Sequence, residues 1–100
     1  MSYEIFRTAI LKKQQVVCTY NGHERHVCPH VIGTKGGKAH VLSFQFGGTS
    51  SSGLPPGGEW RCMNFDAIAN AKAHEGQWFT DGPHTKPQTC VDRVDVEVSY

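Results

Sequence analysis

The chain has 100 residues, the usual size of one domain, and a chain of this length buries only a thin core. Hydrophobic residues make up 38% of it and charged residues 19%, which excludes an intrinsically disordered protein. Ten Lys and Arg stand against nine Asp and Glu, a formal net charge of +1. That balance excludes a sequence-wide basic field for nucleic acid or anionic lipid, so any anion site must be local.

The N-terminal third predicts a helix followed by a hairpin. Ser2 suits an N-cap, and the apolar residues of 3–13 share one helical face, so we expect a short amphipathic helix there. Residues 16–20 read as a strand, and Asn21-Gly22 after it is the strongest short-range hairpin signal in the chain. The returning strand should cover residues 25–32.

The middle of the chain predicts a third strand and a long loop. The Gly-rich residues 33–37 make a turn into a strand over 38–46, where His40, Leu42, Phe44 and Phe46 alternate with Val41, Ser43 and Gln45. We expect the face with Leu42 and the two Phe residues to be the apolar one. Residues 47–58 are rich in Gly, Pro and Ser, which favours a long loop.

The last 42 residues predict three further strands. Residues 59–65 read as a fourth strand, 66–69 as a short turn capped by Asp66, and 71–79 as a fifth strand. After a turn near 81–83, alternating valines predict a C-terminal strand within 88–99. There is no internal repeat, so residues 1–100 are expected to form a single domain.

Strand parity groups the basic residues with apolar faces. Arg25 has the parity of Val27, Arg61 that of Met63, and His40 that of Leu42, while a two-residue hairpin gives Tyr20 the parity of Arg25. Since an unpaired charge is not stable deep in a thin core, these side chains are expected at the rim.

The rim would then carry two guanidiniums, an imidazole and a phenol. Guanidiniums bind phosphate or carboxylate in a bidentate way, so the predicted partner is a nucleotide-like anion. The alternative is structural, with Arg25 and Arg61 paired to acids among Glu24, Glu59 and Asp66.

The spacing of several short motifs resembles the WYL domain of bacterial regulators over residues 9–79. The matching positions are Ala9-Ile10, Val16, Tyr20-Asn21-Gly22, Arg25, Val27, Pro29 and Arg61-Cys62-Met63-Asn64-Phe65-Asp66-Ala67-Ile68. The chain departs from the family pattern in having Ala39-His40-Val41 in place of Trp-Tyr-Leu, and Ala67 in place of a second Arg.

The resemblance implies a mainly β fold, a small SH3-like or Sm-like β-barrel over 15–79 preceded by the helix at 3–13. It also implies a non-catalytic domain that senses a ligand, often a nucleotide or single-stranded nucleic acid, and regulates transcription with a DNA-binding domain, here a separate protein. The expected ligand-binding residues are Tyr20, Arg25, His40 and Arg61, with Asp66 orienting the turn. No cofactor is implied.

Two other functions compete with this interpretation. A zinc site could use His23, His26, Cys28 and His30, but parity divides these residues between two faces and the alternative is exposed histidines beside a packed Cys. The second competing function is protein–protein interaction or self-association, through a sheet face or through the C-terminal strand. Catalysis is not expected, because no cysteine or serine stands in a nucleophile motif.

The N-terminal Met-Ser-Tyr-Glu lacks the blocks of a signal peptide, and the apolar runs are short, so we expect a cytoplasmic protein with no membrane association. In that compartment the four cysteines are expected to be reduced, mostly packed thiols, with disulfides as the alternative.

Overall fold

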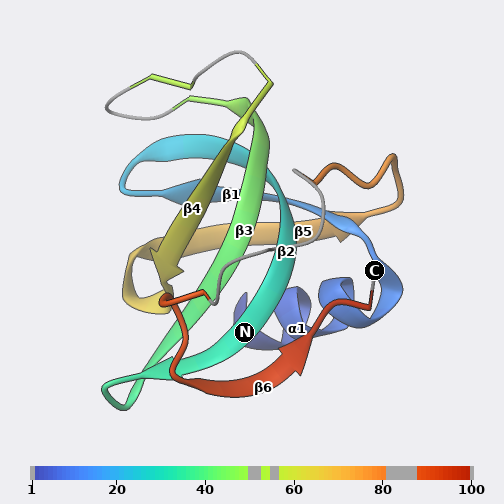
Figure 1. Cartoon of the computed structure of the whole chain (residues 1–100). Coiled ribbons are helices and arrows are strands. Elements are labelled where there is room, and N and C mark those ends of the chain that lie inside the picture. The colour runs from blue at the N-terminus through green and yellow to red at the C-terminus, as the bar shows by residue number, and fades with distance from the viewer. Residues whose placement is uncertain (1, 50–52, 55–56, 81–87, 100) are drawn as a thin grey trace.

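A computed structural model describes residues 2–49, 53–54, 57–80 and 88–99 (Figure 1). Their helical elements are α1 (Ser2–Lys12) and the 3₁₀ turn η1 (Phe65–Ala67). The strands are β1 (Gln15–Tyr20), β2 (His23–Lys35), β3 (Lys38–Gly48), β4 (Glu59–Asn64), β5 (Ile68–His74) and β6 (Arg93–Glu97). The expectation of a mainly β domain with one N-terminal helix is confirmed.

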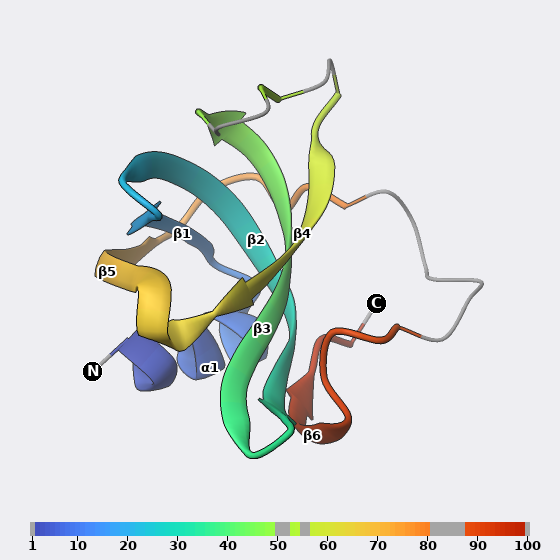
Figure 2. The ribbon, with the colours of Figure 1, turned by 90° about the vertical axis from the view of Figure 1, so that its left-hand side faces the viewer.

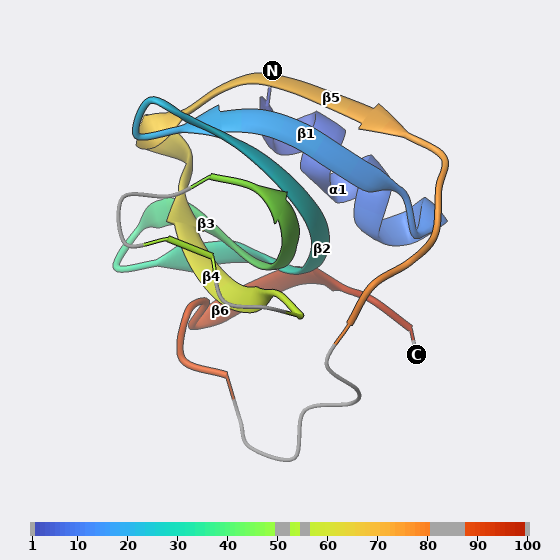
Figure 3. The same cartoon turned by 90° about the horizontal axis from the view of Figure 1, so that it is seen from above.

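All strands belong to one antiparallel sheet in the order β4-β3-β2-β1-β5, with β6 paired to β2. Strand β2 organises this sheet, because its first half pairs with β1, its last residues pair with β6, and β3 runs along nearly its whole length. The sheet is strongly curled when seen from above (Figure 3). Within the described residues β4 and β5 are not hydrogen-bonded neighbours, so the sheet does not close into a barrel.

The helix and the first hairpin form close to where the sequence predicts them, although Ser2 lies inside the helix instead of capping it and the helix ends at Lys12. Phe6, Ala9 and Ile10 of α1 are buried against the concave side of the sheet, here called the inner face. Asn21 and Gly22 both adopt positive φ, 51° and 80°, which matches the twist of the two strands they connect. Helix α1 lies at one end of the curled sheet, and the end of β3 and the beginning of β4 lie at the other (Figures 1 and 2).

Strand β3 is buried on both faces, and this corrects the prediction of a single apolar face. Val41, Ser43 and Gln45 are fully buried toward the inner face, where Val41 joins the cluster that includes α1. Leu42 and Phe44 point to the opposite, outer face. Both faces are covered because chain segments beyond β5 return across the outside of the sheet.

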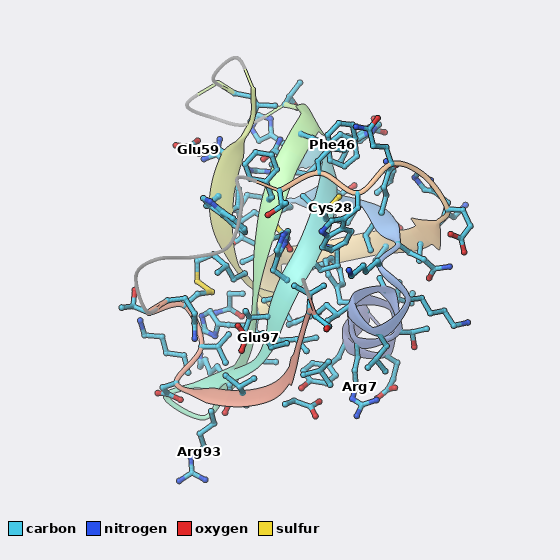
Figure 4. All side chains as sticks on the ribbon, turned by 45° about the vertical axis from the view of Figure 1, so that its right-hand side comes forward. Arg7, Cys28, Phe46, Glu59, Arg93 and Glu97 are labelled. Carbon is cyan, nitrogen blue, oxygen red and sulfur yellow. A yellow bond between two sulfur atoms is a disulfide. The ribbon has the colours of Figure 1, made fainter. Side chains whose placement is uncertain are left out.

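The outer face is covered by two returning segments. Trp78 and Phe79, which follow β5, contact His30 and Phe46 with ring centroids 4.7 and 4.5 Å apart. Cys90 and Val91, which precede β6, pack with Val31 and Leu42. Figure 4 labels Cys28 and Phe46 on this side of β2 and β3. The segment before β6 thereby completes a second apolar cluster, whereas Trp78 also packs against the cluster that includes α1.

Several predictions need correction. The fifth strand begins at Ile68, not at 71, because η1 ends at Ala67, and it ends at His74 because residues 75–80 cross the outer face. The turn is capped by Asn64, whose side chain accepts from the Asp66 N–H, while Asp66 itself points outward. The C-terminal strand is limited to Arg93–Glu97. Residues 50–52 and 55–56 of the predicted loop and the predicted turn at 81–83 lie outside the described residues.

The prediction of four reduced thiols is wrong for two of the cysteines. Cys62 on β4 and Cys90 are joined in a disulfide, and Cys18 and Cys28 are free and buried. The pairing arises because β6 docks on β2 and brings the residues before it alongside β4. In the part of the chain that the structure describes, no helix is long and apolar enough to cross a membrane.

Candidate functional site

The polar end of the inner face is built around Gln45. Its side-chain oxygen, Oε1, accepts from Arg25 Nη1 and from Arg61 Nε, each at 3.2 Å. Arg25 comes from β2 and Arg61 from β4, and β3 lies between these strands. The structure therefore brings together the two arginines that sequence parity placed on inner-facing positions.

Local backbone contacts hold Gln45 in this orientation. Its Nε2 donates to the carbonyl oxygens of Gly47 and Thr49, at 2.9 and 3.1 Å. Because an amide has separate donor and acceptor ends, these two bonds turn Oε1 toward the arginines. Gln45 is therefore a fixed, neutral acceptor shared by two cations.

Arg25 is the more buried of the two arginines, with 4% of its surface exposed. Its guanidinium carbon lies 5.1 Å from the centre of the Tyr20 ring, a cation–π distance, and Nη2 donates to the Tyr20 carbonyl at 3.5 Å. Burial, followed by the like charge of Arg61, lowers the pKa of Arg25 from its usual value. Among the described residues, Arg25 Nε has no hydrogen-bond partner and no carboxylate forms an ion pair with Arg25.

Arg61 is more accessible than Arg25 and forms an ion pair with Glu59. Its Nη2 lies 2.8 Å from Glu59 Oε2, with side-chain exposures of 18% and 43%, and also donates to the Gly53 carbonyl at 3.2 Å. Figure 4 labels Glu59 on β4. The structural alternative is thus correct for Arg61 and Glu59, whereas Glu24 contacts His26 and Asp66 lies 3.9 Å from Lys38.

Tyr20 belongs to the cluster but is already engaged. Its hydroxyl accepts the Asn64 backbone N–H at 3.2 Å, and its ring covers Arg25. It is half-buried. Tyr20 therefore positions Arg25 through its ring and its carbonyl oxygen.

His40 and Asp66 lie away from the cluster. His40 pairs with Gly33 and Asn64, five residues along β3 from Gln45, which is about 16 Å of extended strand. His40 lies on the same face of β3 as Leu42. That face is the outer one, because the larger apolar side chains of β3 point outward. Asp66 is exposed in η1. The predicted four-residue rim thus reduces to Tyr20, Arg25 and Arg61.

The residues considered for a zinc site on β2 do not converge, because each contacts a different partner. His23 contacts Thr49, and His26 contacts Glu24. His30, expected to be exposed, is fully buried, with ring centroids 4.6 Å from Trp60 and 4.7 Å from Trp78. Within the described ranges no group of three His, Cys, Asp or Glu side chains could hold a metal ion.

Burial also sets the pKa of the two free thiols, Cys18 and Cys28. It raises the pKa of Cys18 and of Cys28 to about 11, although Arg25 opposes the effect at Cys18 and the Phe79 N–H opposes it at Cys28. Both thiols remain protonated at neutral pH and are weak nucleophiles.

Sequence reasoning missed Gln45 as the residue that links the arginines. The available signal was a lone amide in the middle of an otherwise apolar strand, because a buried amide needs partners for both of its ends. Comparisons with protein-family models, curated proteins and solved structures find no match to this chain.

Proposed function

We propose that this chain is a non-catalytic binding domain that takes a small anion, such as a nucleotide or the phosphates of single-stranded nucleic acid, at Arg25 and Arg61. The observation that carries the proposal is their convergence on one neutral oxygen of Gln45. Among the described residues the ion pairs join Arg61 to Glu59 and join no carboxylate to Arg25. A phosphate or carboxylate would supply the missing negative charge through charge-assisted hydrogen bonds.

The order of contact follows from exposure. The ligand meets Arg61 first and displaces Glu59, whose side chain is partly exposed and free to swing into solvent. Arg25 lies behind Gln45 and acts mainly through its charge, which a partly desolvated site transmits more strongly than water does. Tyr20 keeps Arg25 in place through its ring.

The fold and setting proposed for this activity follow the resemblance to WYL domains. In this proposal the curled sheet with its N-terminal helix is a variant of the SH3-like or Sm-like barrel. Ligand occupancy is passed to a separate DNA-binding protein in the cytoplasm. The domain is proposed to be non-catalytic because its free thiols are buried and protonated.

Thermal-shift titration tests the proposal directly. Pyrophosphate, adenosine and guanosine nucleotides and an oligothymidylate serve as probes, since a ligand that binds only the folded state raises the melting temperature. We expect stabilisation that weakens as salt rises. Arg61→Gln should abolish it, and Arg93→Gln, which removes an exposed arginine from β6, should not. No stabilisation by any probe would refute the proposal.

A second candidate, association through a sheet edge, rests on β6. Among the described strands β6 pairs only with β2, so its other edge has no strand partner there, and Val94 on it is 49% exposed. Sedimentation equilibrium decides this alternative. It predicts a dimer that Val94→Lys dissociates and Arg61→Gln leaves intact.

A further inference from the structure

A surface pocket lies on the outer face, away from the arginine cluster. Its volume is about 450 Å³, within the range of small-molecule sites. Strands β2, β3 and β4 supply one side and the segment before β6 the other, through Lys35, Leu42, Trp60, Cys62, Gln88, Thr89 and Cys90.

The disulfide forms part of the wall of this pocket. The two cysteines differ in access, because Cys62 is exposed and Cys90 is 5% exposed. The yellow bond in Figure 4 marks the disulfide. An attacking thiolate must reach one sulfur directly, so access decides which sulfur reacts. In this pocket the accessible residue is Cys62.

We propose that the pocket is a thiol–disulfide exchange site, in which a small acidic thiol attacks Cys62 and becomes attached to it. The incoming thiolate forms a bond to Cys62 Sγ as the bond between Cys62 and Cys90 breaks, and the electron pair leaves on Cys90 Sγ, which then takes up a proton. A second thiol can attack the mixed disulfide, which releases the oxidised small disulfide and leaves Cys62 reduced. Two thiols thus supply the two electrons.

The lining of the pocket selects an acidic thiol. Lys35 Nζ is held at the rim by the Thr89 carbonyl, at 2.6 Å, next to Cys90 in the sequence. An ammonium there attracts a carboxylate on the incoming molecule and favours the thiolate that leaves on Cys90. Leu42 and Trp60 provide apolar surface for the rest of the molecule.

The fold holds the C-terminal segment in place when the disulfide opens. Backbone bonds from Asp92 N to Thr34 O and from Val98 N to His30 O flank the β6 ladder, at 2.9 and 2.7 Å. Exchange therefore modifies the pocket without releasing the segment. Cys18 and Cys28 do not compete, because both are buried.

Mass spectrometry tests the proposal on the full chain purified without reductant. The protein is incubated with reduced glutathione, quenched with acid at short times, alkylated and mapped by peptide. We expect one glutathione on Cys62 and an alkylated Cys90, with Cys18 and Cys28 free of glutathione. Glutathione found on Cys90, or no adduct before urea is added, would overturn the proposal, as would a purified protein with four free thiols.

Two pairs of variants test separately which sulfur is attacked and whether Lys35 selects an acidic thiol. Cys90→Ser, which leaves Cys62 as a free thiol, should react with oxidised glutathione at least tenfold faster than Cys62→Ser, with circular dichroism showing that both are folded. Lys35→Gln should slow exchange with glutathione roughly two- to fivefold, as expected for one partly exposed charge pair, and should slow exchange with neutral mercaptoethanol less, because mercaptoethanol has no carboxylate for Lys35 to attract. Lys38→Gln is the matched control, because Lys38 pairs with Lys35 across the turn and is not among the pocket residues. Equal slowing by both lysine variants would refute the acidic selection.

Discussion

Arg25 and Arg61 donate to the same acceptor atom, Oε1 of Gln45, from two strands that are not neighbours in the sheet. A single amide oxygen offsets little of the repulsion between two guanidiniums, and the lowered pKa of Arg25 reflects both burial and the charge of Arg61. The arrangement is costly for the fold alone. In the proposed function a bound anion would offset this cost, which is the usual relation between stability and function at a binding site.

Replacing Arg25 with methionine should therefore stabilise the fold while it weakens binding. Methionine keeps the packing of the stem, removes a buried charge that has no carboxylate partner among the described residues, and leaves Gln45 Oε1 bonded to Arg61. We expect Arg25→Met to raise the free energy of unfolding by about 1 kcal/mol in urea titrations. A loss of more than about 2 kcal/mol would mean that the fold requires the charge.

Stability should fall at alkaline pH because of Tyr3. Burial, followed by the hydrogen bond to Asp95, raises the pKa of Tyr3 from 10.0 to about 12 in the folded state. A raised folded pKa gives stability that is complete below pH 10 and is lost as pH rises toward 12. Urea unfolding at several pH values checks this, and Tyr3→Phe should show a smaller alkaline loss than the wild type.

Asp95 should make stability fall at acid pH, whereas Tyr3 makes it fall at alkaline pH. The Tyr3 hydroxyl, and then Arg7, hold its pKa below its usual 3.8 in the folded state. The stabilisation is thus present above pH 3.8 and is lost as pH falls through the lower folded value. Asp95→Asn should remove this acid dependence in the same urea titrations, and an unchanged profile would show that the carboxylate contributes nothing.

Loss of the disulfide should lower stability considerably. The bond between Cys62 and Cys90 closes a segment with a sequence separation of 28, and loop-closure entropy for such a length corresponds to about 3 to 4 kcal/mol. The double variant Cys62→Ala with Cys90→Ala should lose that amount in urea titrations. Added reductant should destabilise the wild type and leave the double variant unchanged. A wild type insensitive to reductant in urea would contradict this expectation.

Local patterns predicted the elements that depend on neighbouring residues. The helix, the Asn21-Gly22 hairpin and the first four strands were found within a few residues of their places, because caps, turn residues and alternation act locally. The pairing of Cys62 with Cys90 and the burial of His30 could not be predicted in this way. Both depend on segments far along the chain that return across the outer face.

Strand alternation predicted the inner face correctly for Arg25 and Arg61 but not for His40, and the reason is physical. Arg25 and Arg61 lie on strands whose inward parity is shared with Val27 and Met63, both fully buried. On β3 the larger apolar side chains face outward, and the inner positions hold Ser43 and Gln45. A strand buried on both faces carries no alternation to read. Within β2, a bulge between Pro29 and Val31 exchanges the faces to which odd-numbered and even-numbered side chains point.

The last prediction concerns Glu59, which pairs with Arg61 and in the proposed function would compete with the anionic ligand for it. Its carboxylate lies 2.8 Å from Nη2 and is partly exposed, so an incoming anion must displace it. Glu59→Gln keeps the shape and removes the charge. A partly exposed pair of this kind is worth up to about 1 kcal/mol, so anion affinity should rise up to about fivefold. Calorimetric titration with pyrophosphate at low salt measures the change. Asp66→Asn, which removes an acid remote from the cluster, is the matched control, and equal gains from both variants would indicate a general charge effect and contradict binding at Arg61.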